Sequence, residues 1–159
     1  MRIGIISDSH GDHKALAAVA AKAGQVDLWL HAGDCAPDAD YLQRITEVEV
    51  VRVLGNCDWP NDKLTPAEII ETGSHKIFLT HGHLYGVNFG LDALEKEATQ
   101  CKCDIAVYGH THIAGQWNNA GVLILNPGSI SRPRGGGPAS FMVLEEKRGE
   151  LSVKLIELI

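Results

Sequence analysis

The sequence has no long apolar run and no excess of positive charge. Its longest apolar stretch, from Ala15 to Ala21, is far short of the about 18 residues that a membrane helix needs. Met1 leads directly into an expected strand, so we expect neither a membrane span nor a signal peptide. The 14 lysines and arginines are outnumbered by 20 aspartates and glutamates, giving a formal net charge of −6. This balance disfavours non-specific binding of nucleic acids.

Cysteine is also scarce, and the few cysteines are poorly placed for a structural role. They form neither a C-x-x-C pair of the zinc-binding type nor the dense pattern of a disulfide framework. The four positions are Cys35, Cys57, Cys101 and Cys103. We expect reduced thiols and therefore a cytoplasmic protein.

Internal repeats, low-complexity tracts and charged tails are absent from the 159 residues. Hydrophobic residues make up 45% of the chain, which is ordinary for a globular protein. At this length about 70% of the unfolded surface can be buried. We expect one domain over residues 1–159.

Short β-branched runs alternate with stretches of helical periodicity, which predicts an α/β fold. The run Arg2–Ile6 favours a central strand, and Asp12 is a suitable N-cap for a helix over residues 13–23. The last three expected strands are separated by turn signals alone, which favours antiparallel or mixed sheet there. Further strands are expected over residues 27–30, 48–54, 67–72, 76–79, 104–108, 122–125, 140–144 and 151–156, and further helices after Pro37 and over residues 91–101.

Five polar clusters each follow an expected strand directly. Because the carboxyl ends of strands in an open α/β sheet converge on one rim, these clusters can meet. Their carboxylate, amide and imidazole groups suit Mn²⁺, Fe²⁺, Zn²⁺ or Co²⁺ better than Ca²⁺. The clusters are Asp8-Ser9-His10-Gly11, Gly33-Asp34, Gly55-Asn56-Cys57-Asp58, Thr80-His81-Gly82-His83 and Gly109-His110-Thr111-His112.

In this order the clusters resemble those of the calcineurin-like metallophosphoesterases. The resemblance is closer to their small, single-domain YfcE-type phosphodiesterase branch, and it extends to Asn126-Pro127-Gly128-Ser129 near the end of the chain. It implies a four-layer α-β-β-α sandwich, in which two mixed sheets are flanked by helices.

The resemblance also implies a dinuclear metal centre and the residues that hold it. The first metal would be bound by Asp8, His10, Asp34 and His112, and the second by Asp34, Asn56, His81 and His110. Two divalent transition metals are expected, Mn²⁺ first, with Ni²⁺, Co²⁺, Fe²⁺ and Zn²⁺ as alternatives. A hydroxide that bridges them would attack phosphorus in a small phosphodiester, and the inner shell would keep a charge of about +1.

Cys57 departs from the wider superfamily, where a histidine follows the Gly-Asn pair. A thiol is a poorer proton donor to a leaving alkoxide at neutral pH, because its reference pKa is about 8.5. We therefore expect weak activity on esters with poor leaving groups and good activity on activated diesters. Two neighbours are further candidates: Asp58 to orient Asn56 or a metal-bound water, and His83 to contact phosphate, supply a proton or orient a ligand.

Two other functions compete with a phosphodiesterase. One is a protein-interaction scaffold that keeps a metal site, similar to the retromer subunit of this fold. The other is an iron protein with an open site of two histidines and one carboxylate. The competent side chain at every expected ligand position argues against pure scaffolding, and the shared Asp34 favours two metals.

Several residues are assigned more modest roles. Trp29 is expected in the core and Trp59 at the wall of a substrate pocket, whereas Arg132 and Arg134 are expected in a solvated loop rather than a phosphate-binding flap. A homo-oligomer is plausible, with the C-terminal strand either finishing a sheet or forming a dimer interface through Leu151, Val153, Leu155 and Leu158. Structural or surface positions are expected for His13, His31 and His75.

Overall fold

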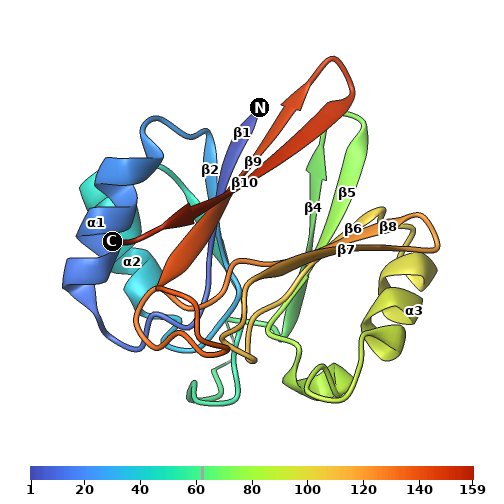
Figure 1. The fold of residues 1–159 in the computed structure, drawn as a ribbon, viewed down its shortest axis with the longest axis horizontal. Helices are drawn as coiled ribbons and strands as arrows, with labels where there is room; N and C mark the ends of the chain where they lie inside the picture. The colour runs from blue at the N-terminus through green and yellow to red at the C-terminus, as the bar shows by residue number, and fades with distance from the viewer. Residues whose placement is uncertain (62) are drawn as a thin grey trace.

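Two mixed sheets face each other in the structure, a computed structural model that describes residues 1–61 and 63–159 (Figure 1). The first sheet has five strands in the order β10-β9-β1-β2-β3: β1 (Arg2–Ile6), β2 (Leu28–His31), β3 (Val50–Arg52), β9 (Ser140–Lys147) and β10 (Glu150–Glu157). The second has five in the order β4-β5-β6-β8-β7: β4 (Ala67–Thr72), β5 (His75–Thr80), β6 (Ile105–Val107), β7 (Gly115–Asn119) and β8 (Val122–Asn126).

Helices cover the outer faces of both sheets and complete four layers (Figure 1). The helices α1 (His13–Ala23) and α2 (Asp38–Thr46) pack on the first sheet, and α3 (Asp92–Gln100) packs on the second. A short 3₁₀ turn, η1 (His83–Tyr85), follows β5. The expected α-β-β-α sandwich is confirmed.

The core between the sheets is built from the inward faces of their central strands. Ile5 and Leu30 from the first sheet lie in one cluster with Ile77, Leu79 and Val107 from the second, and all are fully buried. At roughly 25 cal/mol per Å² of apolar surface, burial of such side chains stabilises the sandwich strongly. The same contacts fix how one sheet sits over the other.

The first strand and helix form as the sequence predicts. In β1, Ile3 pairs with Leu28 of the parallel β2 and with Leu144 of the antiparallel β9, so this strand is central. The carboxylate of Asp12 accepts a hydrogen bond from the backbone N–H of Ala15 at 2.9 Å, which is the predicted N-cap.

The structure differs from the sequence prediction at two strands. The strand expected over residues 48–54 is only Val50–Arg52 long, since the N–H of Leu54 donates to the carbonyl of Thr65 instead of a neighbouring strand. The strand β7 was not expected, because its sequence of Gly, Gln, Trp and two Asn is typical of a turn. It forms as an exposed edge strand through its antiparallel pairing with β8.

The C-terminal strand finishes the first sheet. Leu151 and Val153 pack against the core between the sheets, and Leu158 packs against the layer under α1 and α2. Only Leu155 of the residues considered for a dimer interface is markedly exposed, at 47%. In the described part of the chain, no helix has the length and hydropathy of a membrane span.

The topology gathers six loops at one end of the molecule. The strands β1, β2 and β3 run parallel, as do β5, β6 and β8. The loops that follow these strands meet between the two sheets (Figure 1). The five polar clusters of the sequence lie in these loops.

Candidate metal centre

The loops after the parallel strands bring all the predicted metal ligands to one place. Both sheets contribute, so the centre spans the gap between them. The contributions are Asp8 and His10 after β1, Asp34 after β2, Asn56 after β3, His81 after β5, and His110 and His112 after β6.

The backbone at these residues is held in an unusual conformation. Positive φ angles occur at Asp8 (54°), His10 (47°), Asp34 (61°), His110 (66°) and His112 (60°). Non-glycine residues rarely adopt this left-handed region, and each such residue costs on the order of 1 kcal/mol. Strain of this kind concentrates at functional sites, and here it turns the side chains away from the strand direction toward a common centre.

Two glycines allow the loops to approach the carboxylates closely. A Cβ atom on Gly55 would collide with the carboxylate of Asp34, and one on Gly109 would collide with Ser7 and Asp8. The glycines beside the polar clusters are therefore needed for space as well as for turns.

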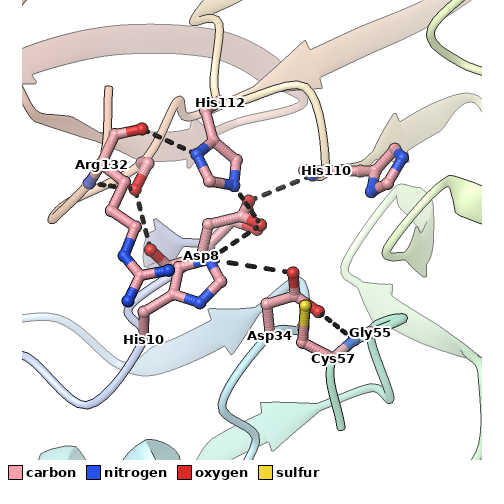
Figure 2. Close-up of polar contacts among 12 residues, drawn as sticks. Asp8, His10, Asp34, Gly55, Cys57, His110, His112 and Arg132 are labelled. Carbon is pink, nitrogen blue, oxygen red and sulfur yellow. Dashed lines mark hydrogen bonds and ion pairs between the residues drawn. The ribbon is translucent and has the colours of Figure 1, made fainter. Parts of the chain in front are cut away.

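The first predicted ligand set forms a compact group. Each of Asp8, His10, Asp34 and His112 offers one atom, and these atoms lie within 4.8 Å of one another. Nε2 of His112 is 3.1 Å from Oδ1 of Asp8, and Nε2 of His10 is 3.9 Å from the same oxygen (Figure 2). Nε2 of His10 is also 3.8 Å from Oδ2 of Asp34.

Two atoms of this group are buried and have no hydrogen-bond partner in the part of the chain that the structure describes. They are Oδ1 of Asp8 and Nε2 of His10. Buried polar atoms are nearly always paired, because an unpaired one costs about 1–3 kcal/mol. Both atoms are good ligands for a divalent transition metal, so the residues fit such an ion.

The second predicted ligand set converges on Asn56. Its Oδ1 atom is 2.9 Å from Nε2 of His81 and 3.0 Å from Nδ1 of His110. Nε2 of His81 is also 3.4 Å from Oδ2 of Asp34. The carboxylate of Asp34 therefore lies between the two groups and is within reach of both.

Backbone carbonyls orient two of the histidines. Nδ1 of His81 donates to the carbonyl of Ala32, and Nδ1 of His112 donates to the carbonyl of Arg132, both at 2.7 Å. With the proton on Nδ1, Nε2 presents its lone pair to the centre. This arrangement is typical of metal-binding histidines.

The charges of the centre are coupled. Burial acts to raise the pKa of Asp34, but contact with His81 and the N–H of Cys57 outweigh it and hold that pKa well below its usual range. Burial lowers the pKa of His10, assisted by the nearby Arg132 guanidinium, and burial beside His81 lowers the pKa of His110. An ionised Asp34 and neutral His10 and His110 are the forms that bind cations.

Asp58 supports the centre through backbone amides. Its Oδ2 accepts from the N–H groups of Asp34 (3.0 Å) and Gly55 (2.7 Å), and its Oδ1 accepts from those of Cys35 (2.9 Å) and Ala36 (2.8 Å). The contact expected with Asn56 is replaced by these bonds. Asp58 thus joins the loop after β2 to the loop after β3.

Cys57 and His83 lie at the edge of the centre. The N–H of Cys57 donates to Oδ1 of Asp34 at 2.9 Å. Cys57 is an exposed residue, but partial burial of its thiol and the nearby Asp34 carboxylate raise the pKa of that thiol. His83 has its ring 5.4 Å from that of His81, and burial lowers its pKa. Its Nδ1 atom has no hydrogen-bond partner among the described residues, so this nitrogen orients no predicted ligand.

A buried network beneath the loops was not expected from the sequence. Ser9 Oγ donates to Oδ2 of Asp38 at 2.6 Å and lies 2.9 Å from Nε2 of His31, which is wholly buried. Burial lowers the pKa of His31 to about 4, so this ring is neutral. The network fixes the Asp8–His10 loop, and His31 is structural as predicted.

Serines near the end of the chain hold the loop after β1. The hydroxyls of Ser129 and Ser131 donate to the carbonyl of Asp8 at 2.8 and 3.0 Å. Asn126 donates from Nδ2 to the carbonyl of Gly109 at 3.2 Å. The sequence signal for these contacts was the Asn-Pro-Gly-Ser motif directly after a late strand.

The other histidines and tryptophans agree with their modest assignments. His13 stacks on Tyr41, and His75 pairs with Asp104, both away from the centre. Trp29 is fully buried in the core, and Trp59 lines a cavity that opens beside His10 and Cys57.

Comparisons of sequence with known proteins identify the family. Residues 1–149 match the calcineurin-like phosphoesterase superfamily domain. The chain is 35% identical over 159 residues to the probable metallophosphoesterase YsnB of Bacillus subtilis, a match covering 99% of this chain and 91% of YsnB. It is 36% identical over 116 residues to the phosphodiesterase YfcE of Escherichia coli, covering 67% of this chain and 59% of YfcE.

Solved structures agree with the sequence relatives. A predicted phosphoesterase from Streptococcus pneumoniae superposes with a TM-score of 0.83 at 34% identity, covering 98% of this chain and 88% of the other. Vps29 of Entamoeba histolytica in complex with Zn²⁺ superposes with a TM-score of 0.78 at 25% identity, covering 98% of both chains. The resemblance seen in the sequence motifs is confirmed, and the chain belongs to the calcineurin-like phosphoesterase superfamily.

Proposed function

We propose that this protein is a phosphodiesterase that uses two divalent metal ions. Asp8, His10, Asp34 and His112 would hold the first ion, and Asn56, His81 and His110 would hold the second together with Asp34. The observation that carries the proposal is that two buried atoms of this ligand cluster, Oδ1 of Asp8 and Nε2 of His10, have no hydrogen-bond partner among the described residues.

Asp34 has the central role. Its Oδ2 atom is 3.8 Å from Nε2 of His10 in one group and 3.4 Å from Nε2 of His81 in the other, so one carboxylate can serve both ions. The chemistry supplied by two such ions is a nucleophile formed from water near neutral pH and neutralisation of charge on the phosphoryl oxygens. No side chain is needed as a nucleophile.

The residues around the ligands would bind and orient the substrate. Arg132 is exposed, in line with the solvated loop expected from the sequence, but its side chain runs beside His10 (Figure 2), and we therefore assign its guanidinium a contact with a phosphoryl oxygen. Cys57 and His83 flank the centre and are proposed as the side chains nearest the leaving group. The thiol of Cys57 is a weak proton donor there, which favours activated diesters.

The donor set is compatible with several metals. Carboxylate, amide and imidazole ligands without thiolates suit Mn²⁺, our first choice, and also Ni²⁺, Co²⁺, Fe²⁺ and Zn²⁺. The Zn²⁺ complex of the related Vps29 supports a divalent transition metal in this fold.

Hydrolysis of bis-p-nitrophenyl phosphate tests the proposal. Protein stripped with a chelator should be inactive, and added Mn²⁺ should restore release of nitrophenol. Failure of folded protein with each of Mn²⁺, Co²⁺, Ni²⁺ and Zn²⁺ would contradict it. That outcome would favour the alternative function, a metal-bearing interaction scaffold, which the structural similarity to Vps29 supports.

Three further proposals concern the location, the domain organisation and the oligomeric state of the protein. The described cysteines are free thiols, which supports a cytoplasmic location. A single domain over residues 1–159 and a homo-oligomer stay predictions, to be measured by limited proteolysis and by light scattering.

A further inference from the structure

A large cavity opens directly beside the proposed metal centre. Its volume is about 820 Å³, and His10, Cys57 and Arg132 lie in its lining. Cavities of roughly 300–1,000 Å³ are the usual size for small-molecule sites. A group attached to a phosphate at the centre would therefore extend into this space.

One part of the cavity lining is apolar and carries an exposed aromatic ring. Pro37, Leu54 and Leu64 contribute apolar surface. Trp59 also lines the cavity, and 89% of its surface is exposed. An indole ring left in water at the opening of a cavity is available to stack on a flat ligand.

Another part of the lining carries charged side chains. Arg52 is only 17% exposed and pairs at 2.7 Å with Asp40, which is 75% exposed, so the pair presents a donor and an acceptor to the cavity. Lys63 and Arg132 add two further cations. The cavity thus combines a stacking surface, hydrogen-bonding groups and positive charge near the centre.

We infer that this cavity binds the nucleoside arm of the phosphodiester substrate, with the base stacked on Trp59. The inference rests on the proposed function, since the phosphate is placed at the metal centre beside Arg132. A base stacked on an aromatic side chain gains about 1–3 kcal/mol, or roughly five- to 150-fold in binding.

A nucleoside fits the lining better than an acyl chain does. A base has an apolar face for Trp59 and a polar edge for the Arg52–Asp40 pair. An acyl chain could offer no hydrogen bond to this pair, and it would cover the Arg52 side chain, which is only 17% exposed, with apolar groups that keep water from its remaining N–H donors. The charges therefore favour a nucleoside.

The reaction to be measured keeps the nucleoside on phosphorus. Oxygen from water forms a new bond to phosphorus, and the bond to the p-nitrophenyl oxygen breaks. Nitrophenolate leaves with the electron pair, one proton of the water stays on the new phosphate oxygen, and the other is released to solvent. The products are a nucleoside 5′-monophosphate and nitrophenolate.

Two substrates with the same leaving group isolate the contribution of the nucleoside. We would compare the p-nitrophenyl ester of thymidine 5′-monophosphate with methyl p-nitrophenyl phosphate, using Mn²⁺-loaded protein. The inference predicts that kcat/KM is at least about fivefold higher for the thymidine ester. Equal values would overturn the inference and leave the proposed function intact, whereas no hydrolysis of either ester would count against the proposed function.

Substitutions of Trp59 test whether this side chain causes the preference for the thymidine ester. Trp59→Ala should lower the ratio of kcat/KM for the thymidine ester to that for the methyl ester to about one, and Trp59→Phe should keep part of the preference. Phe89→Ala is the matched control. Phe89 is also an exposed aromatic residue, at 96%, and it follows Asn88, which contacts His110. Phe89 does not belong to the described residues that line the cavity. A preference unchanged in Trp59→Ala would overturn the role of this residue.

Binding gives a readout that needs no catalysis. Thymidine 5′-monophosphate should quench the tryptophan fluorescence of Mn²⁺-loaded wild-type protein, and the quenching should be lost in Trp59→Phe but kept in Phe89→Ala. Quenching that persists in Trp59→Phe would place the nucleoside elsewhere. An acyl-phosphodiester that binds more tightly than the nucleotide, measured by calorimetry, would also contradict the inference.

Discussion

Asp34 is the residue on which the proposed centre depends most. Its carboxylate lies 3.8 Å from Nε2 of His10 and 3.4 Å from Nε2 of His81. Oδ1 of Asp8 is also 3.8 Å from Nε2 of His81, but our assignment gives Asp8 to the first metal alone. We predict that Asp34→Asn lowers metal occupancy at both positions and that Asp8→Asn lowers it mainly at the first. Bound metal would be measured after dialysis by inductively coupled plasma mass spectrometry. Full occupancy and full rate in Asp34→Asn would show that this carboxylate does not bridge.

Cys57 governs which leaving groups the centre can expel. Its thiol is a poor proton donor near neutral pH, because burial and the Asp34 carboxylate raise its pKa. We predict that Cys57→His increases turnover of phosphate monoesters with poor leaving groups by about tenfold or more, since general acid catalysis contributes about 10²–10⁴ in favourable cases. Bis-p-nitrophenyl phosphate serves as the control substrate and should change little. No gain on the poor leaving groups would argue that proton donation is not limiting.

At the scale of elements, Asp58 connects two loops that carry proposed ligands. Four backbone N–H groups donate to its carboxylate, from the loop of Asp34 and from Gly55. We predict that Asp58→Ala lowers the free energy of unfolding by about 3 kcal/mol and weakens metal binding, because hydrogen bonds to a charged group contribute about 1.5–3 kcal/mol. Urea denaturation and metal titration would measure both.

The surface carboxylate of Glu71 provides the comparison for Asp58→Ala. Glu71 is 72% exposed and forms an ion pair with Lys76 at 3.2 Å, so Glu71→Gln should cost less than about 1 kcal/mol. If Asp58→Ala were as mild as Glu71→Gln, the loops would not depend on the carboxylate.

The ion pair between His75 in β5 and Asp104 before β6 should make stability depend on pH. Contact with Asp104 raises the pKa of His75 above its ordinary 6.5, and contact with His75 helps to lower the pKa of Asp104 against the effect of burial. The His75 contribution is therefore fully present below pH 6.5 and is lost as the pH rises through the raised folded-state pKa. The Asp104 contribution is present above its unfolded pKa and is lost as the pH falls.

We therefore predict that the deficit in unfolding free energy of His75→Gln is larger at about pH 5.5 than at about pH 9. Urea denaturation at both pH values measures it, and Asp104→Asn should remove the difference. Equal deficits at the two pH values would show that the pair does not couple to folding.

Most elements could be predicted from the sequence because local signals mark them. Apolar runs that end at polar or turn-forming residues mark β1 and β8, and Asp12 marks the start of α1. The edge strand β7 could not be predicted, because its residues are polar and only pairing with β8 makes it a strand. Register between distant strands likewise depends on tertiary packing.

The candidate ligands could be found from the sequence for a related reason. Each lies directly after a strand, and topology then brings strand ends together. The supporting contacts of Asp58 and His31 could not be found in that way, and the motif that contains Ser129 marked the position of that serine but not its partner. These contacts depend on exact loop conformations and on close approaches such as that of Gly55 to Asp34.

At the scale of the whole molecule, the proposed centre joins the two sheets. Asp8 and Asp34 extend from loops of the first sheet, whereas His81 and His112 extend from loops of the second. The buried layer that includes Ile5, Leu30 and Leu79 fixes the sheets against each other and so sets the distances between these ligands. Function in this fold therefore depends on the packing of the entire sandwich.

The most direct test of the account follows metal content and catalysis together. Chelator-stripped protein would be titrated with Mn²⁺ while bound metal and hydrolysis of bis-p-nitrophenyl phosphate are measured in the same samples. The account predicts that two ions bind per chain and that activity reaches its plateau only when both are bound. Full activity with one ion per chain, or hydrolysis that is unaffected by metal, would contradict it.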